Sequence, residues 1–185
     1  MAVETPEVEL GWEAADFSLP GIDGKTGSLR SLAGEKGTVV AFICNHCPYV
    51  KAITERLVED VEELEELGVS FIAINSNDAG AYPEDSFENM RRFAAERGFN
   101  FPYLHDESQQ VARAYGAVCT PDFFGFDKDL KLKYRGRLDI GRADPLPEGA
   151  PRDLVNAMGR IAERGEGPAQ QFASMGCSIK WKEAA

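Results

Sequence analysis

Two cysteines lie three residues apart in the segment Cys44-Asn45-His46-Cys47. Sulfur atoms at this spacing can close a disulfide on one turn of chain, and a protonated histidine between them favours the thiolate. Such a dithiol exchanges disulfides when one thiolate attacks a substrate and the second thiol releases the product. The pair also fits two ordinary thiols, so the elements around it must decide.

The dithiol is expected at a junction between a strand and a helix. The run from Thr38 to Ile43 is apolar and β-branched without alternation, which predicts a strand buried on both faces. From Pro48 onward apolar residues recur every three or four positions until Gly68, which predicts an amphipathic helix. A helix N-terminus lowers the pKa of a thiol below the free value of about 8.5.

This position assigns roles to the four residues of the dithiol segment. We expect Cys44, at the exposed end of the turn, to attack, and Cys47, one turn further and less accessible, to resolve the mixed disulfide. His46, together with Asn45, is expected to tune the redox couple towards oxidation.

The remaining patterns predict one α/β domain. A second buried strand at 69–74 completes a βαβ unit, and a hairpin-rich segment at 11–37 precedes it. Further helices are expected at 86–97, at 107–115 and from Pro151, with a short extended piece at 101–104 and an antiparallel hairpin formed by 122–126 and 130–135. We expect a domain at 1–165 and a C-terminal extension at 166–185 that packs on it.

Composition excludes several classes of function. The 185 residues carry 20 Lys and Arg against 31 Asp and Glu, and the net charge of −11 disfavours nucleic acid and anionic membranes as partners. The N-terminus lacks a basic start and an apolar core, and no apolar run approaches the ~18 residues of a membrane span. We therefore expect a cytoplasmic protein, monomeric or homodimeric, whose four cysteines serve catalysis or metal binding rather than structural cross-links.

The proline in Thr120-Pro121, just before the predicted hairpin, marks a turn at the start of a strand and leaves backbone groups free for a substrate. Together with the strand and dithiol of 39–47, this segment resembles the thioredoxin superfamily, and specifically its alkyl hydroperoxide reductase and thiol-specific antioxidant branch, over residues 11–140. The resemblance implies a thioredoxin-like fold, a central mixed sheet with helices on both faces, an N-terminal β-hairpin and an extra insertion helix. It also implies that Pro121 is a cis-proline that docks substrate beside Cys44.

The sequence departs from this branch at several positions. Ile43 replaces the usual tryptophan, and Asn45-His46 replaces glycine-proline. Cys44 stands where peroxiredoxins have a threonine, and Cys119-Thr120-Pro121 stands in the region of their arginine. No buried acid is identifiable before the dithiol, where Thr38 stands.

Two further cysteines have open roles. Cys119, two residues before Pro121, is either a third redox thiol or a buried core residue. Cys177 lies in an apolar tail with Ile179 and Trp181, and we hypothesise that it is an additional exchange partner.

We expect a thiol-disulfide oxidoreductase without cofactor or resident metal. Its partners are a protein or small-molecule disulfide and an unidentified dithiol reductant. Two alternatives stay open: a peroxiredoxin-like thiol peroxidase, and a thioredoxin-fold module in which three cysteines and His46 bind copper or zinc, with His105 in a loop.

Overall fold

A five-stranded sheet with the order β6-β5-β4-β8-β9 forms the central layer of the computed structural model, which describes residues 1–183. Strands β4 (Gly37–Phe42), β5 (Val69–Asn75) and β6 (Tyr103–His105) run parallel, and β8 (Asp122–Asp127) and β9 (Leu132–Gly136) are antiparallel to their neighbours. Every residue of β4 is buried, as its unbroken apolar run predicts. The predicted mixed sheet is confirmed.

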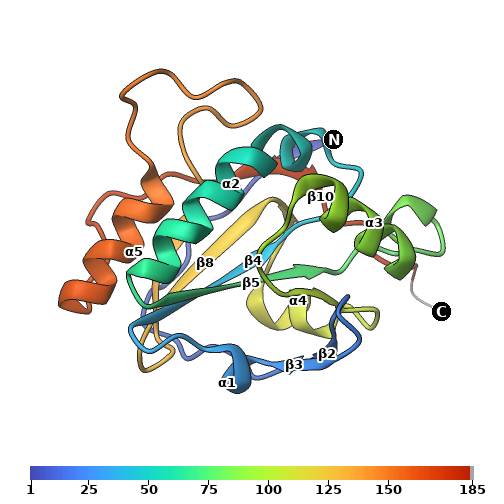
Figure 1. Cartoon of the computed structure of the whole chain (residues 1–185), viewed down its shortest axis with the longest axis horizontal. Coiled ribbons are helices and arrows are strands. Elements are labelled where there is room, and N and C mark those ends of the chain that lie inside the picture. The colour runs from blue at the N-terminus through green and yellow to red at the C-terminus, as the bar shows by residue number, and fades with distance from the viewer. Residues whose placement is uncertain (184–185) are drawn as a thin grey trace.

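Helices cover both faces of this sheet, as predicted (Figure 1). One face carries α2 (Pro48–Glu66), α3 (Phe87–Arg97) and α5 (Asp153–Arg164). The opposite face carries α4 (Gln110–Tyr115), the hairpin of β2 (Ser18–Pro20) and β3 (Thr26–Ser28), and the short α1 (Leu29–Leu32). The N-terminal hairpin and the insertion helix α3 are thus both present.

The helix α2 follows β4 directly and positions the dithiol at its first turn. Its buried apolar residues lie three or four positions apart and face the sheet: Val50, Ile53, Leu57, Val61 and Leu64. The helix ends before Gly68, whose φ of +77° is the left-handed conformation that glycine adopts without strain. The apolar stripe and this end together fix the helix between β4 and β5.

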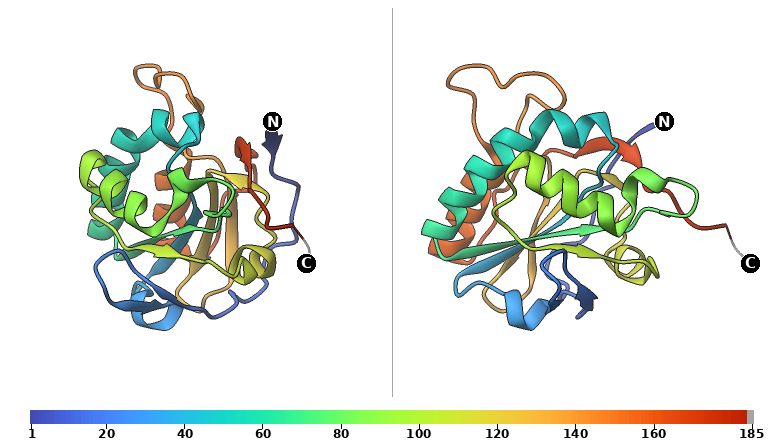
Figure 2. Two further views of the ribbon diagram at one scale, coloured as in Figure 1. Left: turned by 90° about the vertical axis from the view of Figure 1, so that its right-hand side faces the viewer. Right: turned by 45° about the vertical axis from the view of Figure 1, so that its right-hand side comes forward.

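A second, three-stranded sheet lies at one edge of the molecule. Its order is β1 (Ala2–Glu4), β10 (Met175–Ser178) and β7 (Cys119–Thr120), and both pairings are antiparallel. The two ends of the chain therefore run side by side (Figure 2). The domain boundary expected at residue 165 stays a prediction, but part of the segment after it is a strand.

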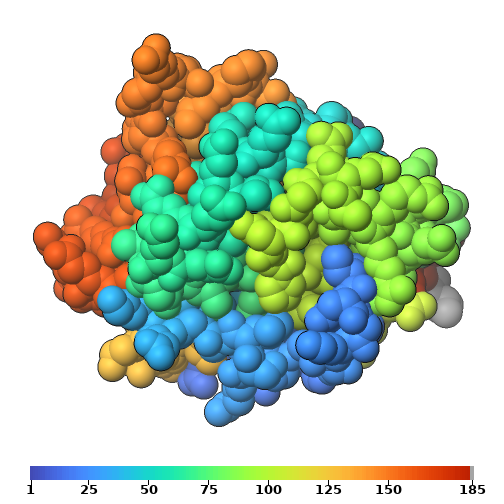
Figure 3. Space-filling view, viewed as in Figure 1, coloured from blue at the N-terminus to red at the C-terminus, as the bar shows by residue number. Residues whose placement is uncertain are grey.

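Several sequence predictions differ from the structure near element ends, among them the helix predicted at 107–115, which begins at Gln110. His105 is buried in β6 rather than placed in a loop, because it pairs with Asn75 of β5. The helix α5 begins at Asp153 instead of Pro151, after a Gly/Pro-rich stretch at 141–151 that stands out from the surface (Figure 3). Across residues 1–183, none of the helices combines the length and apolarity that crossing a membrane requires.

Candidate active site

The dithiol segment joins the end of β4 to the start of α2. The amide of Ile43 still donates to the Ile74 carbonyl of β5, so the strand holds the chain until one residue before Cys44. Cys47 is the N-cap residue of α2, and Pro48 occupies the first helical position, where its missing N–H costs nothing. The predicted junction of strand and helix is therefore where the two sulfurs lie.

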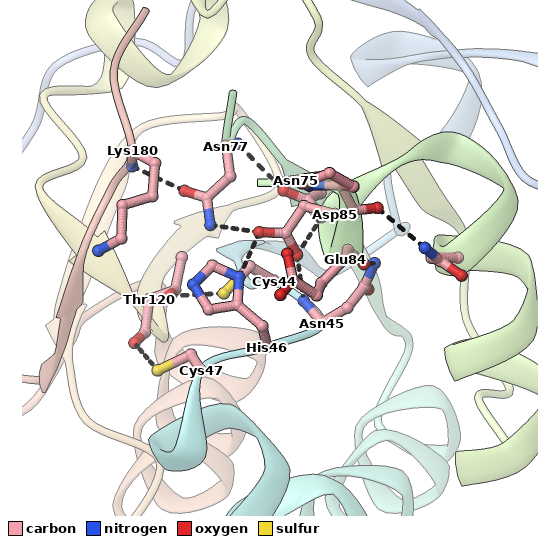
Figure 4. Close-up of polar contacts among 12 residues, drawn as sticks. Cys44, Asn45, His46, Cys47, Asn75, Asn77, Glu84, Asp85, Thr120 and Lys180 are labelled. Atoms are coloured by element: carbon pink, nitrogen blue, oxygen red, sulfur yellow. Dashed lines mark hydrogen bonds and ion pairs between the residues drawn. The ribbon is translucent and has the colours of Figure 1, made fainter. Parts of the chain in front are cut away.

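Both sulfurs meet Thr120 at the end of β7 (Figure 4). Sγ of Cys44 lies 3.2 Å from Oγ1 of Thr120, and the protonated Cys47 thiol donates to the Thr120 carbonyl oxygen at 3.2 Å. The structure thus brings together Cys44, Cys47 and Thr120, three of the residues that the sequence singles out. Both cysteines are free thiols.

The exposure predicted for Cys44 is wrong. Cys44 and Cys47 are both fully buried, at 0% exposure, because segments distant in sequence cover the dithiol turn. The prediction that Cys44 attacks the substrate depends on that exposure, so the structure does not support it. Which cysteine attacks first stays a prediction.

The surroundings shift the pKa values of the two thiols in opposite directions. Cys47 has a pKa lowered to about 5, chiefly because Cys44 donates a hydrogen bond to its sulfur, aided by Cys177 and the Val50 amide and opposed by burial. The pKa of Cys44 is raised by its hydrogen bond with Cys47, by burial and by the carboxylate of Asp85. Cys47 is therefore the sulfur that the surroundings favour as a thiolate.

Asp85 is a buried acid beside the dithiol that the sequence did not reveal. It ends the 3₁₀ turn η1 (Pro83–Asp85), is 0% exposed and lies with His46 within 4.8 Å of Cys44, counted between ligand atoms. Its Oδ1 accepts from the Asn45 amide at 2.7 Å, and its Oδ2 accepts from Nδ2 of Asn77 at 2.8 Å. These donors compensate the burial of its charge.

No local pattern marks Asp85. It stands between two strands, 38 positions after Cys47, in a segment with other acidic residues. The available signal is indirect: Asn75 ends a buried strand and Asn77 follows it, and side-chain amides at a strand end can hold a carboxylate. The family resemblance places a buried acid before the dithiol, whereas Asp85 follows it in the chain.

His46 and Asn45 are fixed by this acid. Nδ1 of His46 lies 2.6 Å from Oδ2 of Asp85, and the imidazole stacks on Tyr82 with ring centroids 5.5 Å apart. The Asn45 side chain is buried, accepts from the Tyr103 hydroxyl at 2.9 Å and donates to the Glu84 carbonyl at 2.9 Å. Asn45 thus anchors the turn, and Asp85 holds the His46 imidazole beside Cys44.

The Thr120-Pro121 peptide bond is cis, in agreement with the resemblance. The edge of β7 is not free, however, because β10 pairs with it and places Cys177 opposite Thr120. Gly176 packs so closely that an added Cβ would lie 1.8 Å from the Thr120 carbonyl oxygen. A role of Thr120 and Pro121 in substrate docking stays a prediction, and it must account for this strand.

Cys119 is a core residue in this structure. It is fully buried, burial raises the pKa of its thiol well above the ordinary range, and its sulfur lies 3.7 Å from the Pro121 carbonyl oxygen. These surroundings favour an unreactive thiol over a redox role.

The residues named for the alternative metal-binding module do not gather in one cluster. Ligand atoms of Cys44, His46 and Asp85 lie within 4.8 Å of one another, but among residues 1–183 this cluster includes neither Cys47 nor Cys177. The carboxylate and imidazole are already bonded to each other. His105, the other histidine, lies in β6 and packs its ring against Phe87 of α3. A soft site of three cysteines and a histidine is thus not preformed in the described residues.

Comparison with known proteins connects this geometry to a family. Residues 10–135 match the profile of the AhpC/TSA family. The thiol-disulfide oxidoreductase ResA of Geobacillus thermodenitrificans (strain NG80-2) is 28% identical over 130 residues, which are 70% of each chain.

Two solved structures extend the comparison. An uncharacterized conserved protein from Geobacillus kaustophilus is 47% identical, with a TM-score of 0.94 over 100% of this chain and 98% of that one. The thioredoxin domain of a thiol-disulfide oxidoreductase from Bacteroides vulgatus is 16% identical, with a TM-score of 0.65 over 84% of this chain and 99% of that one, and shares the fold. The chain thus belongs to the AhpC/TSA family, has the thioredoxin-like fold, and is a thiol-disulfide oxidoreductase.

Proposed function

We propose that the Cys44–Cys47 pair reduces protein or small-molecule disulfides, with Cys47 as the attacking thiolate and Cys44 as the resolving thiol. The observation that carries this order is the position of Cys47 as the N-cap residue of α2, where hydrogen bonds from Cys44, Cys177 and the Val50 amide lower the pKa of its thiol to about 5. Cys44 instead lies beside the carboxylate of Asp85, which opposes a negative charge on its sulfur.

The exchange takes place in two steps. The Cys47 thiolate bonds to one sulfur of the substrate disulfide, the substrate S–S bond breaks, and the first product leaves as a thiolate. Cys44 then loses its proton and attacks Sγ of Cys47, which forms the Cys44–Cys47 disulfide and releases the second product. Two electrons pass to the substrate, and an external dithiol returns them in a later cycle.

The pair formed by His46 and Asp85 supports the second step. Cys44 must give up a proton in a buried place, and the imidazole and carboxylate lie within 4.8 Å of its sulfur. One bridging water molecule spans such a distance. These two residues therefore position a charge and a proton acceptor beside the resolving thiol.

Location and partners extend this proposal. The net charge of −11 supports a protein that acts without nucleic acid or an anionic membrane surface, and in a cytosolic location the reductant would be a cellular dithiol. We propose that the protein acts as a monomer or a homodimer.

Reduction of insulin disulfides tests the proposed function. We expect turnover by the wild type and at least a hundredfold loss in both Cys44→Ser and Cys47→Ser, with Cys119→Ser as the matched control of unchanged activity. Mass spectrometry of the oxidised wild type should show the 44–47 linkage. Equal activity of the wild type and Cys44→Ser would refute the dithiol mechanism.

A further inference from the structure

The chain's own strand β10 occupies the edge of β7 next to both sulfurs. In this pairing Cys177 lies opposite Thr120, and Ser178 lies opposite Cys119. Since the Cys47 thiol reaches the Thr120 carbonyl, the register brings Cys177 to the start of α2. The segment thus holds a cysteine where a bound substrate strand would present its own sulfur.

Cys177 is in direct contact with Cys47. Cys177 is one of the neighbours that lower the pKa of the Cys47 thiol. Cys177 also packs against the apolar cluster that contains Cys44 and Cys47. Of the four cysteines, three are buried, and Cys177 is the one that keeps contact with the surface.

The strand is held firmly on both sides of Cys177. After it, the Ile179 amide donates to the Val118 carbonyl at 3.0 Å, and the Lys180 amide donates to Oδ1 of Asn77 at 2.9 Å. Before it, Gly176 fits against the Thr120 carbonyl with no room for a Cβ. Such anchoring favours chemistry that leaves the strand in place over chemistry that requires its removal.

We propose that Cys177 is a third redox thiol, which receives disulfides at the surface and passes them to the buried Cys47. This inference rests on the proposed function of the Cys44–Cys47 pair and changes its first step: Cys177 attacks the substrate disulfide, and the Cys47 thiolate attacks the mixed disulfide that forms on Cys177.

The steps balance in protons and electrons. Cys177 attacks one sulfur of the substrate disulfide, the substrate S–S bond breaks, and the first product leaves as a thiol with the proton that Cys177 gives up. Cys47 next attacks Sγ of Cys177, which releases the second product and forms a Cys47–Cys177 disulfide. Finally Cys44 attacks Sγ of Cys47, so the disulfide moves to 44–47 and Cys177 returns to the thiol.

Removal of the last acceptor should trap the intermediate. We expect Cys44→Ser, oxidised with diamide and digested under non-reducing conditions, to yield a peptide linkage between Cys47 and Cys177. The Cys44→Ser/Cys119→Ser variant should give the same linkage, and Cys44→Ser/Cys177→Ser should give no linkage. A free Cys177 in oxidised Cys44→Ser would overturn the inference.

A rate measurement tests the path itself. Cys177→Ser should lower insulin reduction at least tenfold, while its 44–47 pair still oxidises with diamide, and Cys119→Ser should stay unchanged. Full activity of Cys177→Ser would also overturn the inference, because substrates would then reach Cys47 directly. The trapping experiment needs no substrate, so an inactive wild type with a 47–177 linkage in Cys44→Ser would count against the proposed function and not against the third thiol.

Discussion

Oδ2 of Asp85 lies 2.6 Å from Nδ1 of His46, although 39 residues separate the two in the chain. The pair places a fully buried carboxylate against a half-buried imidazole on the turn that carries the dithiol. The carboxylate also accepts from amides of Asn45 and Asn77. One acid thus connects the dithiol turn to the end of β5 and sets the charge next to Cys44.

Removal of this charge should shift the redox couple. Asp85→Asn keeps the shape but takes away the carboxylate that raises the pKa of Cys44, so the thiolate forms more easily and the reduced state is favoured. We expect the reduction potential, titrated against glutathione, to become more positive by about 30 mV or more. Asp106→Asn is the matched control, a buried acid bonded to Ser76 and the Ala112 amide. A lower potential in Asp85→Asn would contradict this account.

A thiolate should persist in mildly acidic solution. Because the pKa of Cys47 is lowered to about 5, the anion is present above that pH and disappears as the pH falls through it. Thiolate absorbance at 240 nm should therefore show one transition near pH 5 in the reduced wild type. Cys47→Ser should lose the transition and Cys119→Ser should keep it. A transition lost in Cys44→Ser but unchanged in Cys47→Ser would reverse the order of attack.

Displacement of β10 should uncover Cys47. In Gly176→Ala the new Cβ would lie 1.8 Å from the Thr120 carbonyl oxygen, so the strand must move at a cost of about 1–3 kcal/mol. We expect Cys47 to react at least tenfold faster with Ellman's reagent, and the 47–177 linkage in Cys44→Ser to become weaker. Gly159→Ala is the control, because its nearest contact would be an ordinary 3.6 Å to Leu67. Unchanged reactivity would show that β10 does not cover the site.

Peroxide reduction is the alternative that the position of Cys47 keeps open. A sulfur with a lowered pKa at the first turn of α2 suits attack on a hydroperoxide. Cys44, however, fills the place of the peroxiredoxin threonine, and β7 brings Thr120 to both sulfurs. We expect stopped-flow oxidation by hydrogen peroxide to be no faster than that of a free thiolate. Fast oxidation that is lost in Cys47→Ser and kept in Cys44→Ser would establish the peroxidase.

A buried ion pair on the face of the sheet that carries α4 should contribute to the free energy of unfolding. Arg135 bonds both carboxylate oxygens of Asp122, which is fully buried and has a pKa raised to about 6 by burial. Arg135→Met leaves that acid without its cation. We expect the free energy of unfolding at pH 7, measured in urea, to fall by about 3–5 kcal/mol.

The pH dependence of this loss has a definite sign. An acid whose folded pKa lies above its ordinary value destabilises the fold as the pH rises from about 4 through the folded value. The defect of Arg135→Met should therefore be smaller at pH 4 than at pH 7. Arg92→Met, which breaks an exposed pair with Glu88, should change stability by less than about 0.5 kcal/mol. An equal defect at both pH values would exclude Asp122 as its cause.

The sequence predicts the parts of the site that depend on periodic patterns. The buried run of β4 and the apolar spacing of α2 place Cys44 and Cys47 correctly, because each pattern reports its own secondary structure. The cis bond before Pro121 follows from the family resemblance.

The parts that the sequence does not predict are long-range. The side-chain amides of Asn75 and Asn77, at the end of β5, hold Asp85 beside the dithiol. Only tertiary packing therefore distinguishes Asp85 from the acids on the surface. The strand β10 has only four residues and contains glycine and serine, so neither alternation nor β-branching marks it. The burial of Cys44 depends on such contacts, and the prediction of its exposure fails for that reason.

Strand β1 forms the outer edge of the three-stranded sheet and lies two strands from β7. Neighbouring strands are spaced about 4.8 Å apart, so a foreign peptide that paired with the free edge of β1 would lie three spacings, about 14 Å, from the backbone of Thr120. Strands β1 and β10 therefore keep an extended polypeptide from binding next to the two sulfurs. A substrate disulfide would then approach the site at the exposed part of Cys177. Strands β1 and β10, from opposite ends of the sequence, thus shield the dithiol from other contacts.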